Sequence, residues 1–86
     1  MIVPLSQIHP DQQVRVVWIA SPPFMAKRLR DLGFAESEAL TCVLRRPRRG
    51  MAAYLVCGSI IALRYSTASE IFVETMPAER KLPANT

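Results

Sequence analysis

Apolar and polar residues alternate along most of the chain, which is the pattern of half-buried β-strands. Several of these stretches are also rich in β-branched and aromatic residues, which favour strands. Together they predict five short strands, at residues 14–19, 39–46, 52–57, 60–65 and 71–74. Gly50 and Gly58 lie between the middle stretches, where tight reversals of the chain are expected.

One segment departs from this alternation and repeats its apolar residues with helical spacing. Met25, Leu29 and Leu32 fall at i, i+4 and i+7, so they share one face of a helix. The basic residues of the segment lie mostly on the rest of its surface. The pattern predicts one short basic amphipathic helix over residues 22–32, inserted after the first strand.

The residues that flank this helix predict where it starts and stops. Ser21 is expected to cap the first turn, and Pro22 fits inside that turn, where its missing N–H has no consequence. Gly33 stands where a left-handed residue closes the last turn, with Phe34 placed for an apolar contact beyond it.

Two single helical turns are predicted at short polar motifs. Ser6 is placed to cap a turn that ends before Pro10. Thr67 and Glu70 have the spacing of a capping box, which predicts another turn just before the last strand.

Five strands, tight turns and one inserted helix predict a mainly β fold, a small sheet that bends until it closes as a barrel. We expect one domain over residues 1–76, followed by a disordered tail over 77–86, which holds two prolines and little apolar surface. The predicted core consists of the apolar positions on the inner faces: Val14, Val16, Leu29, Leu32, Leu40, Leu44, Leu55, Ile61, Leu63, Ile71 and Val73.

Composition and charge indicate a globular protein with acidic partners. The 86 residues carry a net charge of +4, which favours nucleic acid, an anionic membrane face or an acidic protein surface without choosing among them. No apolar run approaches the roughly 20 residues of a membrane-spanning helix, and the start lacks the features of a secretory signal. We therefore expect a cytoplasmic location.

The sequence offers two isolated cysteines, Cys42 and Cys57. In a reducing compartment both are expected to be buried free thiols that pack as small apolar groups. A disulfide stays an alternative if their strands pair.

Few residues could support catalysis or hold a metal. His9, the one histidine, and Asp11 could bind a divalent transition metal weakly at the surface, but a closed site normally takes four ligands. The alternative is a solvated histidine before a turn. Asp31 is expected to pair with Lys27 or Arg28 on the helix surface. We expect no enzymatic activity and no cofactor required for folding.

Basic residues gather in two short segments, which hold seven of the eleven positive charges. They are Lys27, Arg28 and Arg30 in the helix, and Arg45, Arg46, Arg48 and Arg49 around the turn at Pro47. The turn is either a solvated tip or a contact site for an acidic protein surface or the anionic inner membrane leaflet. Trp18, Tyr54 and Ile60 are candidate apolar anchors, since aromatic residues often dominate binding energy. The alternative for Trp18 is a core or lid residue, which is the more common role of a lone tryptophan in a first strand.

A run in the helix, Arg28-Leu29-x-Asp31-Leu32-Gly33-Phe34, is the most distinctive motif of the chain. Further positions accompany it in the same order of elements: Leu5-Ser6, Pro10, Arg15-Val16, Gly58, Ala62-Leu63-Arg64, Glu70-Ile71 and Val73. Over residues 5–74 the sequence thereby resembles the FeoA family, small SH3-like cytosolic proteins encoded with the ferrous iron transporter FeoB. The same domain type occurs in iron-dependent repressors, but this chain has no room for their helix-turn-helix portion.

The resemblance implies a function that the residues alone do not indicate. It implies a non-catalytic accessory or regulatory module for ferrous iron uptake that docks on the cytoplasmic part of FeoB. Such a module could lie at the periphery of the inner membrane. The alternative is a small basic barrel that binds nucleic acid. Such binding would weaken steeply as salt rises, because nucleic acid releases condensed counterions.

Overall fold

A computed structural model describes residues 1–76, and the tail predicted over 77–86 lies outside the described residues. The five strands and the one longer helix that the hydrophobic pattern predicts are all present, together with a sixth, short strand at the start of the chain. In order, the elements are β1 (Ile2–Pro4), the 3-10 turn η1 (Leu5–Gln7), β2 (Gln13–Ile19), α1 (Pro23–Leu32), β3 (Ala39–Arg46), the 3-10 turn η2 (Pro47–Arg49), β4 (Met51–Val56), β5 (Ser59–Arg64), α2 (Tyr65–Ala68) and β6 (Ile71–Thr75).

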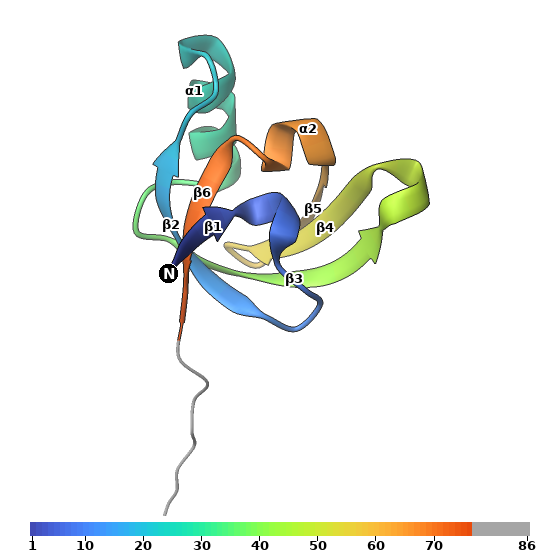
Figure 1. The fold of residues 1–86 in the computed structure, drawn as a ribbon. Helices are drawn as coiled ribbons and strands as arrows, with labels where there is room; N and C mark the ends of the chain where they lie inside the picture. Colours follow the sequence, from blue (N-terminus) through green and yellow to red (C-terminus); the bar gives the residue numbers. More distant parts are fainter. Residues whose placement is uncertain (77–86) are drawn as a thin grey trace, which may run out of the picture.

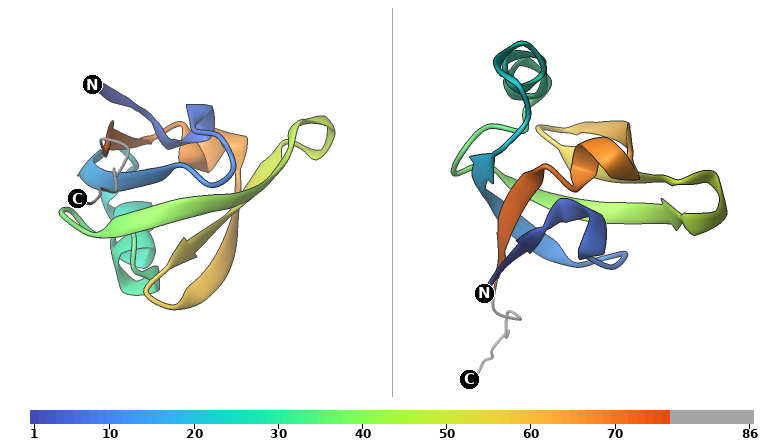
Figure 2. Two further views of the ribbon diagram at one scale, coloured as in Figure 1. Left: turned by 90° about the horizontal axis from the view of Figure 1, so that it is seen from below. Right: turned by 45° about the horizontal axis from the view of Figure 1, so that its top comes forward.

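The strands form one antiparallel sheet in the order β1-β6-β2-β3-β4-β5. The sheet bends around a single core, α1 lies at one end, and the β3–β4 hairpin projects away from the rest of the molecule (Figures 1 and 2). The predicted mainly β, SH3-like barrel with one inserted helix is confirmed. The strand missing from the prediction is β1, whose three residues pair with β6 and are too few to show an alternation.

Helix α1 ends where the sequence predicts. Gly33 has a φ of 113°, in the left-handed region, and its N–H donates to the carbonyl oxygen of Arg30 at 3.0 Å. The N–H of Phe34 donates to the carbonyl oxygen of Leu29 at 2.9 Å, and the Phe34 ring is fully buried. These bonds satisfy carbonyl groups that the last turn would otherwise leave unpaired.

The predicted side-chain caps are wrong at all three helical turns. Pro22 flanks the first residue of α1, and the Ser21 hydroxyl instead donates to a carboxylate oxygen of Glu70 at 2.9 Å. Ser6 and Thr67 lie inside η1 and α2 and make no capping bond. The two single turns themselves are confirmed; tertiary contacts hold them, because α2 packs against both η1 and β5.

The core is one cluster of buried side chains drawn from β2 to β6, from α1 and from the segments that connect them, and Val3 of β1 packs against it. Its largest fully buried members are Tyr54, Phe34, Leu5, Ile8, Leu29, Leu40, Ile71, Val14, Val16, Val56 and Val73. The core prediction is confirmed for Val14, Val16, Leu29, Leu40, Leu63, Ile71 and Val73, and Ile61 packs against the cluster from its edge. It is wrong for Leu32, Leu44 and Leu55, which are 44%, 41% and 41% exposed.

A β-bulge explains the exposure of Leu44. The pairing of β3 with β4 shifts between Cys42 and Leu44, so that Val43 is an extra residue on β3. Beyond this point each side chain of β3 points to the face opposite the one that simple alternation predicts. Leu44 is therefore turned outward, opposite Ala53, and Arg45 is turned inward.

Leu55 and Leu32 are exposed for simpler reasons. Leu55 neighbours Tyr54, whose large ring takes the interior position, so alternation places Leu55 outside. Leu32 is the last residue of α1 and lies beside the shallow groove between this helix and β5.

The two cysteines differ in their surroundings, and both are free. Cys42 is buried, as predicted, and burial raises the pKa of its thiol. The same prediction is wrong for Cys57, which is exposed. Cys57 and Gly58 have φ values of 51° and 79° and form the two-residue turn between β4 and β5, so the thiol stands outside the sheet.

Candidate interaction surface

The positive charge of the chain comes from one region. Residues 39–69, which run from β3 to α2, hold five arginines and no aspartate or glutamate. The other residues carry six basic and seven acidic side chains, so the whole excess of +4 belongs to the acid-free region. The field of such a region attracts acidic partners over several ångströms of solvent.

The basic residues of α1 are largely neutralised by neighbours. Lys27 Nζ lies 3.5 Å from Asp31 Oδ2, one turn along the helix, in line with the predicted pairing of Asp31. The Arg30 guanidinium donates two bonds to the Glu36 carboxylate, at 3.1 and 2.9 Å. These bonds hold the pKa of Glu36 at about 2, well below its ordinary value. Within residues 1–76, Arg28 makes no ion pair.

Arg45 braces the hairpin against the barrel. Because of the bulge its side chain turns inward, where one guanidinium nitrogen donates to the carbonyl oxygen of Ser6 at 3.1 Å. The guanidinium carbon lies 5.5 Å from the centre of the Tyr65 ring, within the range of a cation–π contact. Arg45 thus connects β3 to η1 and α2 and is a poor candidate for partner binding.

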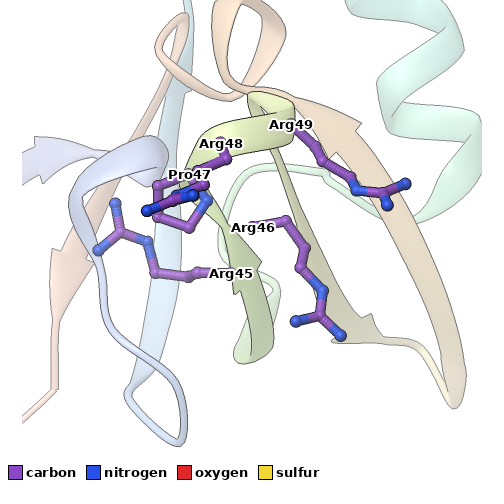
Figure 3. Close-up of a pocket in the computed structure, with 5 residues that line it drawn as sticks. All are labelled: Arg45, Arg46, Pro47, Arg48 and Arg49. Atoms are coloured by element: carbon purple, nitrogen blue, oxygen red, sulfur yellow. The ribbon is translucent and has the colours of Figure 1, made fainter.

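The other arginines of the tip are exposed. Arg46, Arg48 and Arg49 make no ion pair within the part of the chain that the structure describes. Figure 3 shows that Arg46 and Arg49 extend away from Arg45, so the guanidinium groups do not converge on one point. The tip is therefore an open electropositive surface and not a closed anion site.

Exposed apolar residues lie on the side of the hairpin that also carries Arg46 and Arg49. Leu55 on β4 faces Ile60 on β5 directly across the strand pair, and the two are 41% and 68% exposed. Leu44 and Met51 line a shallow pocket together with Arg46 and Arg49. We call this side of β3, β4 and β5 the outer face; it comprises Leu44, Met51, Ala53, Leu55, Ile60, Ala62, Arg46, Arg49 and Arg64, of which Ala53 is covered by its neighbours and only 9% exposed.

Of the three predicted apolar anchors, Tyr54 is wrong. It is 1% exposed, its ring meets Phe34 edge-on at 6.3 Å, and its hydroxyl donates to the carbonyl oxygen of Leu5 at 3.4 Å. The same burial raises the pKa of Tyr54. Ile60 is accessible on the outer face. Trp18 is 56% exposed on β2, where it stacks on Phe72 at 5.2 Å, and β3 and β4 separate it from Ile60 in the sheet.

The weak metal candidates gain no further ligand. His9 and Asp11 are both exposed in the turn before β2, and residues 1–76 contain no group of three or more His, Cys, Asp or Glu placed to hold a metal ion. A weak surface site there stays a prediction. Among these same residues, none of the helices is long and apolar enough to cross a membrane.

Known proteins identify the family to which this fold belongs. The model of the FeoA domain family matches residues 3–75. The chain belongs to the FeoA domain family. A search of curated proteins finds no significant match to this FeoA domain.

Solved structures share the architecture of this FeoA domain. An iron uptake regulatory protein (FeoA) is 23% identical, with a TM-score of 0.79 over 88% of this chain and 100% of its own. The FeoA protein from Chlorobium tepidum is 21% identical, with a TM-score of 0.81 over 98% of this chain and 80% of its own. A manganese-dependent transcriptional repressor is 21% identical, with a TM-score of 0.80 over 87% of this chain but only 37% of its own. At these identities the likeness shows the fold alone.

Sequence reasoning missed part of the outer face of this FeoA domain. Leu44 and Leu55 were expected in the core, and Arg64 was not singled out. The absence of acidic residues from 39 to 69 was an available signal, because it marks the β3–β5 region as the source of the net charge.

Proposed function

We propose that this FeoA domain protein is a non-catalytic accessory module for ferrous iron uptake that docks on the cytoplasmic part of a FeoB-type transporter. The observation that carries the proposal is the acid-free region, which presents free arginines beside exposed apolar side chains in a member of this family. We place the protein in the cytoplasm, including the periphery of the inner membrane.

The chemistry of the described residues supports a binding role. The one histidine of the chain, His9, is exposed, and within residues 1–76 no hydrogen bond joins its ring to a nucleophilic side chain, as nucleophilic catalysis requires. We propose that folding needs no metal. Thermal unfolding should accordingly be the same with and without a chelator, and a large drop in melting temperature would reveal a structural metal.

A direct binding measurement tests the proposed partner. The purified cytoplasmic domain of the FeoB-type transporter from the same organism is immobilised, and the intact chain is passed over it at increasing salt. We expect weak binding that declines between about 0.05 and 0.3 M salt, because screening shortens the reach of surface charges. No binding even at the lowest salt would contradict the proposal.

Nucleic-acid binding is the second candidate, and the five uncompensated arginines favour it. Against it, Tyr54 is buried, so the basic tip has no aromatic platform from this residue on which bases could stack. Duplex and single-stranded DNA of random sequence provide the test. Retention by DNA with a steep salt slope, together with no retention by the transporter domain, would make this second function the correct one.

A further inference from the structure

We propose that the outer face of β3, β4 and β5 is the docking surface, and that it takes a protein segment with apolar side chains along one side and acidic residues at one end. This inference rests on the proposed function and specifies which surface of the chain performs it. Three features of this side of the hairpin support it. The face has exposed apolar side chains, it has arginines without an acidic partner at one end, and it has an acidic residue at the other end.

The apolar part of this face is continuous across the strands. Leu55 and Ile60 are direct cross-strand neighbours, and Ala53 and Ala62 form the next pair toward the tip. Leu44 lies opposite Ala53 on the other side of β4. Small alanines between larger residues leave a shallow apolar floor along which a partner's side chains can pack.

The bulge at Val43 makes this floor possible. Without the extra residue Leu44 would point into the barrel and Arg45 would point outward, so the floor would be interrupted by a charge. An outward-turned leucine at this position has no role in the core of the protein. Its exposure is consistent with a surface that a partner covers.

Charge selects the chemistry of the occupant. Arg46, Arg49 and Arg64 lie at the tip end of the face, where Arg64 is opposite Met51. Arginine presents a planar fork that binds carboxylates through two parallel bonds, as Arg30 does with Glu36 in this molecule. Carboxylates at one end of the partner segment would meet these three forks.

The opposite end of the face carries a negative charge. Glu38 Oε1 lies 3.9 Å from the Cys57 thiol, beside the turn between β4 and β5. From the tip to this turn, the six residues of β4 span about 17 Å. A uniformly anionic lipid surface would face Glu38 as well as the arginines, whereas a protein segment with acid at one end fits both ends.

A second copy of the chain is a less suitable occupant. Two outer faces brought together would juxtapose Arg46, Arg49 and Arg64 of each copy, with Glu38 of each copy as the nearby acid. Like charges in close apposition oppose association. The surplus of arginine therefore indicates a partner that supplies acidic groups of its own.

The test uses the cytoplasmic domain of the FeoB-type transporter as the probe and compares matched variants of the full chain. Ile60→Ser and Arg49→Glu change the outer face. Ile2→Ser on β1, 57% exposed, and Lys27→Glu on α1, where Asp31 already neutralises the charge, change polarity and charge in the same direction elsewhere. We expect the outer-face variants to bind at least tenfold more weakly and the controls to stay within twofold, with unchanged circular dichroism and melting for all four.

Each other outcome has a definite meaning. If the intact chain binds and the outer-face variants bind equally well, the inference is wrong and the proposed function stands. If the intact chain does not bind the transporter domain at all, both fall together.

Two further measurements cover the other occupants. Binding to phosphatidylglycerol vesicles that Ile60→Ser abolishes, or a dimer in sedimentation that the same variant dissociates, would assign the face to lipid or to a second copy. Either result would overturn the inference.

Discussion

Helix α1 and the β3–β4 hairpin each carry a cluster of basic residues, yet the clusters have opposite roles. In the helix, Asp31 and Glu36 neutralise two of three charges, and the helix packs Leu29 into the core. In the hairpin no acidic residue is available, and three arginines of the tip stay exposed. A basic cluster in a sequence therefore describes a surface only after its acidic neighbours are counted.

The comparison implies that α1 contributes mainly to stability and the exposed side of the hairpin mainly to binding, which variants can test. Substitutions in α1 should change the free energy of unfolding and leave partner binding almost unaffected. Substitutions at exposed hairpin positions should do the reverse.

Leu29→Ala should have the largest effect on stability. Leu29 is 1% exposed, and its truncation should lower the free energy of unfolding by about 3 kcal/mol, since it removes buried contacts and leaves a cavity. Leu32→Ala is the matched control and should cost about 1 kcal/mol or less, because that side chain is already 44% exposed. Urea unfolding measures both. Equal losses would mean that α1 packs through Leu32 as well.

Gly33→Ala should lower the free energy of unfolding by about 2 kcal/mol. A Cβ at this position would be strained by the positive φ and would lie 3.0 Å from Cys57 Sγ and 3.2 Å from Val56 Cγ2. Gly58→Ala is the control, since it has a φ of 79° but open space around the added atom, and should cost about 1 kcal/mol. Thermal melts that rank Gly58→Ala as the more damaging variant would refute the close contact between α1 and the β4–β5 turn.

Within the hairpin, Arg45→Ala and Arg46→Ala compare an inward-turned arginine with an exposed one. Removal of its bond to Ser6 and its contact with Tyr65 should cost about 1 kcal/mol of stability. Arg46→Ala removes the same charge from the exposed side and should change stability by less than about 0.5 kcal/mol. Chemical denaturation distinguishes the two, and indistinguishable midpoints would show that Arg45 is not a brace.

Acid should affect the helix side by a small amount through Glu36. Its folded-state pKa of about 2 lies below the ordinary value of 4.5, so the pair with Arg30 stabilises the fold above about pH 4.5 and ceases to do so as pH falls toward 2. Because solvent screens this exposed pair, its contribution should be the smallest of the effects compared here. Melting curves of Glu36→Gln should lie slightly below the unmodified chain at pH 7 and coincide with it at pH 2. A gap that persists at pH 2 would assign the effect to packing.

Much of the fold could be predicted because the local signals agree with one another. The alternation of apolar residues defines five strands, and the spacing of Met25 and Leu29 with the glycine that follows defines α1. The left-handed Gly33 is specified by chemistry alone, since few other residues tolerate that conformation. Such features depend on residues close together in the chain, which a sequence displays directly.

Several of the errors concern interactions between distant segments. Ser21 bonds to Glu70 across the barrel and not to the helix that follows it, and the position of Tyr54 depends on Phe34 and Leu5. The candidate site was predicted in part: Arg46, Arg49 and Ile60 are on one surface, whereas Arg45 and Tyr54 are structural. No residue near Val43 in the sequence indicates the bulge that turns Leu44 outward and Arg45 inward.

The bulge also determines which kinds of change the hairpin can tolerate. Arg46 could become lysine or glutamine and still stand outside, because its direction depends on its position in β3 and not on its chemistry. Deletion of Val43 would exchange the inward and outward positions of every residue from Leu44 to the tip. The length of β3 should therefore be harder to alter than its composition. If related proteins use this hairpin for docking, the number of residues in β3 should be retained among them even where the residues themselves differ.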